Sequence, residues 1–230
     1  MRLRFCSLAL VLALAPGALL AQTPPAAGVP TPPPVQSTPL PPPSAAPAPG
    51  AQTSPPAAPA ASGARTTLFP NPGDQTDVDE GVLPAKPAAV LSGASSWDDA
   101  FGNLKGAFAR IEGELGKAGI APTGRPLTVF VHTDDNGFRY EAMVPIAQAP
   151  EGRNELTPEV KFGKTPEGKS FRFVHKDAYD EIDGTYETIT AYLDAKDIEA
   201  QDAFIEEYVS DFTDAQDTNF EVNIYVQPKG

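Results

Sequence analysis

The sequence of 230 residues has one cysteine, one tryptophan and two histidines, and these scarcities exclude several kinds of site. The cysteine is Cys6, inside the first apolar run, so the rest of the chain has no thiol for a disulfide, a nucleophile or a zinc ligand. His132 and His175 lie far apart and form no metal motif. No nucleophile elbow, phosphate-binding loop or dinucleotide glycine motif is present. We therefore expect no metal, no cofactor and no catalytic residue.

Basic residues are also scarce, with 17 Lys and Arg against 30 Asp and Glu and a net charge of −13. Removal of the first 21 residues would remove Arg2 and Arg4 and bring the net charge to −15. Phosphate binding needs a positive surface, so the composition argues against nucleic acid and anionic lipid as partners. It is compatible with a cationic ligand and equally with solubility alone.

A long hydrophobic run is missing too. The chain begins with Arg2 and Arg4, followed by an apolar run at 5–15, then Pro16-Gly17 and small residues ending at Ala21. This order is typical of a secretory signal peptide cleaved after Ala21, and the run is too short for a membrane anchor. We predict a signal peptide at 1–21 and a periplasmic or secreted protein without a stable membrane anchor.

Residues 22–64 contain fifteen of the 27 prolines and neither a charged nor an aromatic residue. Such a segment has too little apolar surface to offset the entropy lost on ordering, which predicts a disordered Pro/Ala-rich linker. The composition changes at about residue 65. We expect a connecting segment at 65–84 and a folded domain at 85–230.

The expected domain has two similar halves, each with a helix whose apolar residues recur every three or four positions. The first half is predicted to contain an apolar segment at 87–91, a helix at 97–119 and strands at 127–132 and 138–144. The second is predicted to contain a strand at 169–174, a helix at 179–195, an amphipathic piece at 204–209 and a strand at 220–226. This repeat predicts an α+β fold with a pseudo-two-fold axis and helices packed on one face of a shared antiparallel sheet.

The motifs of these halves resemble those of the GyrI-like small-molecule-binding domain, which is also the effector-binding domain of AraC- and MerR-type transcription regulators. In the second half, His175-Lys-Asp-Ala-Tyr-Asp180 opens the helix and Glu221-Val-Asn-Ile-Tyr-Val-Gln-Pro228 ends the domain. In the first half, Gly124-Arg-Pro-Leu-Thr-Val-Phe-Val131 and Glu141-Ala-Met-Val-Pro145 match. The resemblance covers about 85–230.

The resemblance implies a pocket in which a carboxylate, flanked by aromatic rings, attracts lipophilic cations. The final strand lacks the family's proline four residues after the glutamate, so either Glu221 or Asn223 occupies the carboxylate position. The candidate ligand-binding residues are Glu221, Glu141, Tyr179, Trp97, Tyr140, Tyr186, Asn223 and Tyr225. Each of these residues could equally serve in ordinary packing or on a solvated face.

Three functions follow from these observations. The first is an exported binding module for a small, cationic or amphipathic organic molecule. The second is a hydrolase of strained electrophilic molecules that uses Glu141 and Glu221 as a pair. The third is an envelope module that binds a protein partner.

The first predicted helix also carries a second stripe of small residues, Gly102, Gly106, Ala109, Gly113 and Gly116. Glycine inside a helix costs about 1 kcal/mol relative to alanine. The stripe indicates either an exposed face or the close approach of another segment. We expect close approach by residues 65–84.

Overall fold

The computed structural model describes residues 65–230, and the predicted signal peptide at 1–21 and linker at 22–64 lie outside the described residues. The elements of the first half are β1 (Asp79–Leu83), β2 (Pro87–Ser95), α1 (Ala100–Lys117), β3 (Leu127–Asp134) and β4 (Gly137–Pro145). The elements that follow are β5 (Val160–Lys164), β6 (Gly168–Lys176), the single 3₁₀ turn η1 (Tyr179–Glu181), α2 (Ile182–Ala195), β7 (Ala200–Tyr208) and β8 (Glu221–Pro228).

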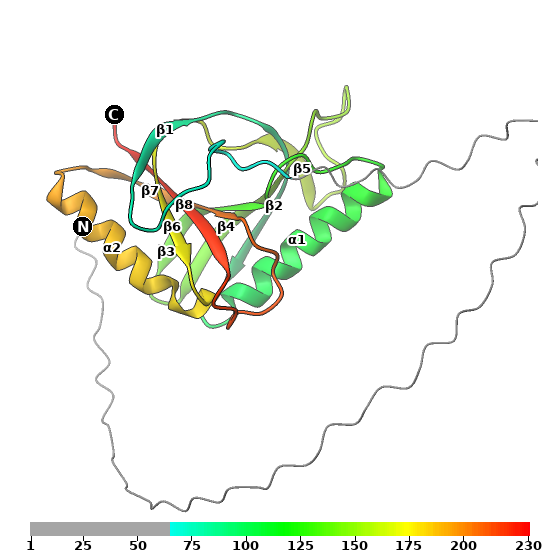
Figure 1. Ribbon diagram of the computed structural model, residues 1–230. Helices are drawn as coiled ribbons and strands as arrows, with labels where there is room; N and C mark the ends of the chain where they lie inside the picture. Colours follow the sequence, from blue (N-terminus) through cyan, green and yellow to red (C-terminus); the bar gives the residue numbers. More distant parts are fainter. Residues whose placement is uncertain (1–64) are drawn as a thin grey trace, which may run out of the picture. The chain divides into compact units, whose positions relative to one another are not determined.

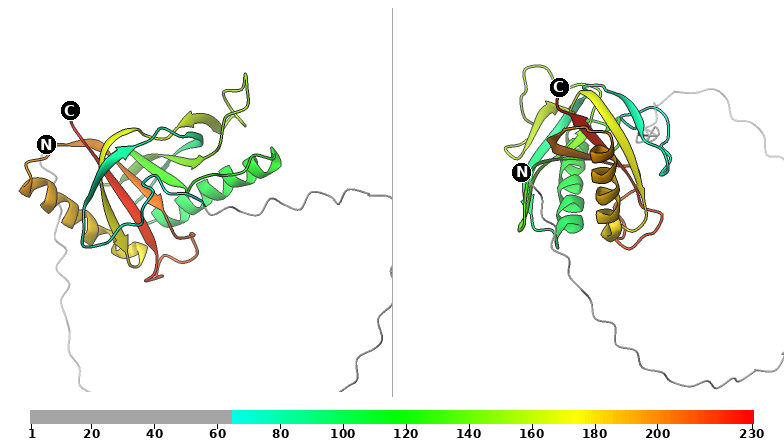
Figure 2. Two further views of the ribbon diagram at one scale, coloured as in Figure 1. Left: turned by 45° about the horizontal axis from the view of Figure 1, so that its top comes forward. Right: turned by 90° about the vertical axis from the view of Figure 1, so that its left-hand side faces the viewer.

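The strands form one antiparallel sheet of eight, in the order β1-β6-β8-β7-β3-β4-β2-β5. Both helices lie on the same side of this sheet, and the views in Figure 1 and Figure 2 leave the other side without a helix. The predicted α+β architecture is therefore confirmed. The amphipathic piece at 204–209 is part of a central strand, β7.

The pseudo-two-fold repeat relates β2, α1, β3 and β4 to β6, α2, β7 and β8, and its axis passes between the paired strands β3 and β7. The two remaining strands are exchanged between the halves, because β1 precedes β2 but pairs with β6, while β5 precedes β6 but pairs with β2. The crossing chains are joined where Lys86 N–H donates to Thr165 Oγ1 and Thr165 N–H donates to Lys86 O, both at 2.9 Å.

The sheet has a core on each face. The larger one lies between the sheet and the helices and includes Leu104, Phe108, Ile111 and Leu115 of the predicted apolar stripe of α1. The smaller one lies on the helix-free face and is covered by Leu68 and Phe69. Central strands are therefore buried on both sides, and this burial explains why β7 and β8 contain near-continuous buried runs instead of an alternation.

The glycine stripe of α1 faces open space. A Cβ atom built on Gly102, Gly106, Gly113 or Gly116 meets nothing within 4 Å. The expectation that residues 65–84 lie across this stripe is wrong. Arg65 bonds Glu112 of α1, but Leu68 and Phe69 pack on the opposite face of the sheet and β1 forms its edge. Among residues 65–230, no helix has the length and apolar character needed to cross a membrane.

Candidate functional site

Two consecutive glutamates lie in the middle of the sheet, on β7. Successive side chains of a strand point to opposite faces, so Glu206 faces the helices and Glu207 faces the helix-free side. Both residues are 1% exposed. A buried carboxylate is costly unless its oxygen atoms are hydrogen-bonded or paired, so each needs partners.

Three tyrosine hydroxyls surround the carboxylate of Glu206. Tyr186 donates to Oε1 at 2.7 Å, and Tyr208 donates to Oε2 at 2.7 Å. Tyr179 donates to Oε2 at 3.2 Å. The Tyr208 hydroxyl has one hydrogen, which it gives to Glu206, so Thr128 Oγ1 at 3.2 Å acts as the donor to Tyr208. The site therefore combines β7 with η1, α2 and β3.

The position of Tyr179 depends on His175, a buried residue at the end of β6. The imidazole Nε2 lies 3.1 Å from Ala178 O, and Nδ1 lies 2.8 Å from Thr185 Oγ1. A carbonyl oxygen only accepts, so Nε2 carries the hydrogen and Nδ1 accepts from Thr185. His175 thus ties the turn that carries Tyr179 to the first turn of α2.

Burial dominates the electrostatics of this site. It raises the pKa of Glu206 above its ordinary value, although the three tyrosine hydroxyls act in the opposite direction. Burial and the nearby Glu206 charge also raise the pKa values of Tyr179, Tyr186 and Tyr208 well above the ordinary value. The phenols therefore stay protonated and remain donors.

Aromatic rings pack against one another on the helix side of the sheet, beside the tyrosines that bind Glu206. The ring of Phe212, in the loop between β7 and β8, lies 4.4 Å from the ring of Tyr208 and 5.1 Å from that of Phe101, centre to centre. Phe108 and Phe220 complete its surroundings at 5.4 and 5.5 Å. The arrangement is a packed aromatic cluster, and two of its members, Tyr179 and Tyr208, bind the carboxylate of Glu206 through their hydroxyls.

One protein-family comparison covers most of the described residues. The GyrI-like small molecule binding domain matches residues 76–229. This chain belongs to that family. The match includes every strand, both helices and all of the residues around Glu206. The predicted resemblance is thereby confirmed, and the domain is a small-molecule-binding domain by family.

Solved structures share the fold at low sequence identity. The C-terminal domain of EcmrR aligns with a TM-score of 0.56 and 13% identity over 66% of this chain and 97% of that chain. EcmrR in its DNA complex aligns with a TM-score of 0.56 and 14% identity over 66% of this chain, and this alignment spans 57% of EcmrR. A hydrolase from Listeria innocua aligns with a TM-score of 0.50 and 13% identity over 68% of this chain and 94% of that chain. The comparison with curated proteins gives no match.

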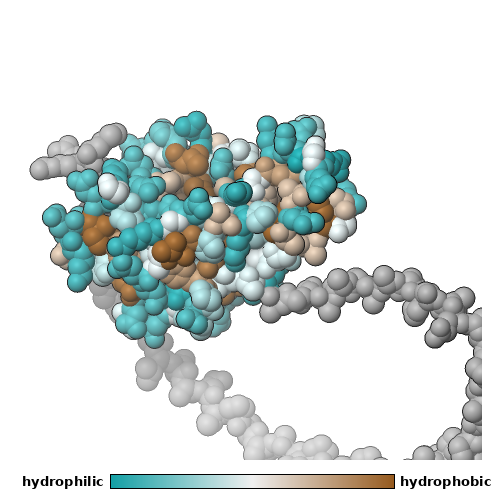
Figure 3. Space-filling model, turned by 90° about the horizontal axis from the view of Figure 1, so that it is seen from above, coloured by the Kyte–Doolittle hydropathy of each residue, from teal (hydrophilic) through white to brown (hydrophobic). Residues whose placement is uncertain are grey.

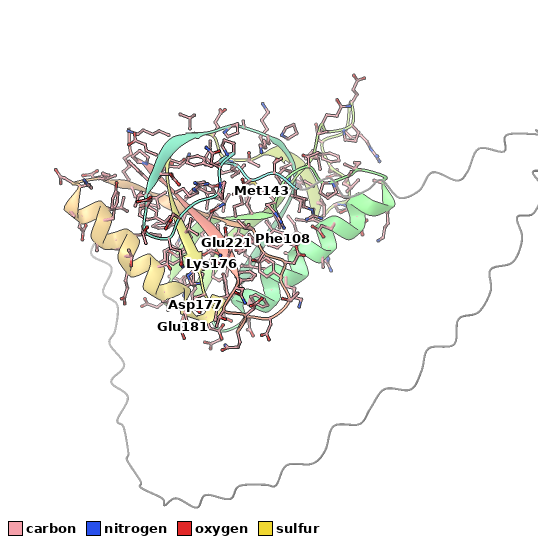
Figure 4. The ribbon with its side chains drawn as sticks, viewed as in Figure 1. Phe108, Met143, Lys176, Asp177, Glu181 and Glu221 are labelled. Carbon is pink, nitrogen blue, oxygen red and sulfur yellow. The ribbon has the colours of Figure 1, made fainter. Side chains whose placement is uncertain are left out.

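Of the eight residues predicted from the sequence, Tyr179 and Tyr186 lie at Glu206. Glu221 faces the helix-free side, where its Oε2 lies 3.8 Å from Lys176 Nζ (Figure 4). Glu141 faces the same side but lies on β4, and β7 and β3 separate that strand from β8. Three strand spacings amount to about 14 Å, so Glu141 and Glu221 do not form a carboxylate pair.

Glu141 lines an open cleft of about 590 Å³ at the edge of the sheet, together with Met143 and Lys161. Arg110 and Glu159 also line it and bind one another at 2.6 Å. Its charged lining has both signs, unlike the aromatic surroundings of Glu206.

The other four predicted residues fall at three places. Asn223 and Tyr225 lie on the helix-free face, where both donate to Glu207. Tyr140 is buried under α1, against Phe138. Trp97 is 47% exposed, and its Nε1–H donates to Asp134 O at 2.9 Å.

Glu206 and Glu207 are not among the residues predicted from the sequence. The signal was the pair itself, because two adjacent glutamates within an apolar strand must point to opposite faces. Their burial could be predicted only with the knowledge that both faces of the sheet are covered, one by the helices and one by Leu68 and Phe69. Among residues 65–230, no group of three or more His, Cys, Asp or Glu side chains could hold a metal ion.

Proposed function

We propose that the domain binds an organic cation between α1 and α2, with the carboxylate of Glu206 as its counter-charge. The observation that carries this proposal is a buried carboxylate without a basic partner. Its hydrogen-bond donors are three neutral hydroxyls, and among residues 65–230 no basic side chain forms an ion pair with it. A cationic ligand would supply the missing charge in a low-dielectric environment.

The surrounding rings support an organic cation instead of a metal ion. Metal ions require several oxygen or nitrogen ligands, whereas the walls here are aromatic faces and edges. A cation over such a face gains about 0.5–2 kcal/mol, more when it is desolvated. The lining consists of Phe101, Phe108, Tyr179, Tyr208, Phe212 and Phe220.

Binding requires Phe212 to move. This ring is only partly buried, and it belongs to the loop between β7 and β8, yet it occupies the centre of the aromatic cluster. Displacement of one loop side chain would open space next to Tyr208 while α1 and α2 remain in place. The ligand would then take over the ring contacts of Phe212.

A pair of probes tests the charge requirement. Isothermal titration of the protein with tetraphenylphosphonium is compared with titration with triphenylphosphine oxide, which carries three of the same aryl groups without the charge. We expect the cation to bind at least tenfold more tightly. Equal affinities, or no binding by either compound, would contradict the proposal.

We also propose that the domain acts outside the cytoplasm, as the basic pair and apolar run of residues 1–21 suggest. The test is fractionation of a bacterial host that expresses the full chain with a C-terminal tag. A mature protein that starts at Gln22 in the periplasm or medium supports export. A cytoplasmic protein that retains residues 1–21 contradicts it.

A further inference from the structure

Residues 65–75, which we name the strap, precede the segment that matches the family, 76–229. The strap nevertheless lies against the sheet, on the helix-free face that is uppermost in Figure 1. Seen from that side, hydrophobic residues form separate patches among hydrophilic ones (Figure 3). A segment outside the matched residues thus covers a face of the matched domain.

Two adjacent side chains anchor the strap. Leu68 is 4% exposed and Phe69 is 7% exposed, and both belong to the smaller core. The ring of Phe69 meets the ring of Tyr225 edge-on at 5.1 Å, and the guanidinium of Arg172 lies 5.3 Å from its centre. Gly81 of β1 leaves room for this ring, since a Cβ atom there would lie 2.7 Å from it.

Side chains of the domain bind the backbone of the strap. Leu68 N–H donates to Glu207 Oε1 at 2.6 Å, and Phe69 N–H donates to the Tyr225 hydroxyl at 3.4 Å. Lys86 Nζ donates to Thr67 O at 3.2 Å, and Arg172 Nη1 donates to Asn71 O at 2.5 Å. Backbone groups are common to all peptides, so these four contacts recognise the backbone of the strap, which bends at 68–71. The surroundings of Leu68 and Phe69 in the smaller core select its side chains.

The buried polar groups on this face are more typical of a ligand-binding surface than of a hydrophobic core. Tyr225 and Asn223 orient Glu207 through bonds of 2.7 and 3.0 Å to Oε2, which leaves Oε1 for the strap. Replacement of a buried ionic group by apolar residues is often neutral or stabilising, so stability alone does not explain a buried carboxylate here. Asn223 Oδ1 is buried and has no hydrogen-bond partner within residues 65–230, so a further donor could be accommodated.

We propose that the helix-free face is a peptide-binding groove for a bent segment with an apolar residue followed by an aromatic one, and that the strap is its ligand in cis. The groove therefore accepts the same segment in trans once the covalent strap is released. This proposal does not depend on ligand binding at Glu206, which lies on the other face of β7.

The test releases the strap from a folded protein. A protease site is inserted between Asp74 and Gln75, in an exposed turn, and the chain is cut after purification. A fluorescent peptide with the sequence of residues 64–74 is then added, and its anisotropy is measured. We expect it to replace the cut strap, whereas the uncut protein binds it at least tenfold more weakly because its groove is occupied.

Variants separate recognition from non-specific adhesion. Peptides with alanine at Leu68 or Phe69 should bind at least tenfold more weakly, and Glu207→Gln in the domain should weaken binding. Glu80→Gln, on the exposed edge strand β1, should not. Failure of the cut protein to bind the peptide, equal binding of the alanine peptides, or unfolding on loss of the strap, as seen by circular dichroism, would overturn the proposal.

Discussion

Glu206 and Glu207 are chain neighbours with opposite surroundings. Tyrosine hydroxyls hold Glu206 on the helix side, whereas an amide, a hydroxyl and a backbone N–H hold Glu207 on the other side. Burial raises the pKa of both carboxyl groups. Each residue is therefore a matched control for the other, because a Glu→Gln change at either position alters one face of the same strand and leaves the other face unchanged.

The raised pKa of Glu206 has a consequence for stability. A group whose pKa is higher in the folded state favours folding below its unfolded pKa, about 4.3, and this contribution is lost as the pH rises through the folded pKa. We therefore expect the stability of Glu206→Gln, relative to the unmodified protein, to increase between pH 4 and pH 8. The gain is about 1.4 kcal/mol for each unit of pKa shift.

Urea denaturation at a series of pH values measures this difference. Glu207→Gln should show the same trend, since burial raises its pKa in the same direction. A stability difference that stays constant from pH 4 to pH 8 in Glu206→Gln would mean that the carboxylate titrates normally in the fold.

At the scale of elements, substitutions in the loop between β7 and β8 should have different effects on binding and stability from substitutions on the outer face of α1. The loop contributes Phe212 to a packed aromatic cluster. The outer face of α1 contributes nothing to packing at its glycines. One element is therefore expected to control ligand access, and the other to tolerate substitution.

Phe212→Ala should open the space between the helices. We expect faster association of tetraphenylphosphonium in stopped-flow measurements and a lower Kd, because no ring has to be displaced. The same change should lower the free energy of unfolding by about 1–2 kcal/mol, since the ring is only partly buried. Thr213→Ala, an exposed change in the same loop, is the control. Unchanged kinetics in Phe212→Ala would show that this ring does not gate the site.

Glycine substitutions should separate open positions from crowded ones. Gly106→Ala and Gly113→Ala should each raise the free energy of unfolding by up to about 1 kcal/mol, because a helix favours alanine and the added methyl group meets no neighbour. Gly81→Ala should lower it, because the methyl group would press on Phe69. Urea denaturation of the three variants decides, and a destabilised Gly106→Ala would mean that another segment packs on α1.

At the scale of the whole molecule, the sequence predicted what depends on local pattern. The helices, the Asn-Gly hairpin and the repeat of two halves follow from periodicity and turn chemistry, and the structure has them. The exchange of β1 and β5 between halves depends on long-range pairing, which no local pattern encodes.

The candidate site was only partly accessible from the sequence for the same reason. Tyr179 and Tyr186 were predicted as site residues, but their partner Glu206 was not. Residues 204–209 have the pattern of an amphipathic segment, and only the pairing of β7 with β3 and β8 shows that this strand is central. The family resemblance instead drew attention to Glu141 and Glu221, which face the helix-free side. The strap, which makes that face an interior, precedes the family match.

The most direct test of the binding account is isothermal titration of tetraphenylphosphonium into Glu206→Gln and Glu207→Gln, with the unmodified protein as reference. The account predicts that Glu206→Gln lowers the affinity at least tenfold at pH 8, while Glu207→Gln, on the opposite face of the same strand, binds as the unmodified protein does. Equal affinities for the two variants, or a larger loss in Glu207→Gln, would contradict it.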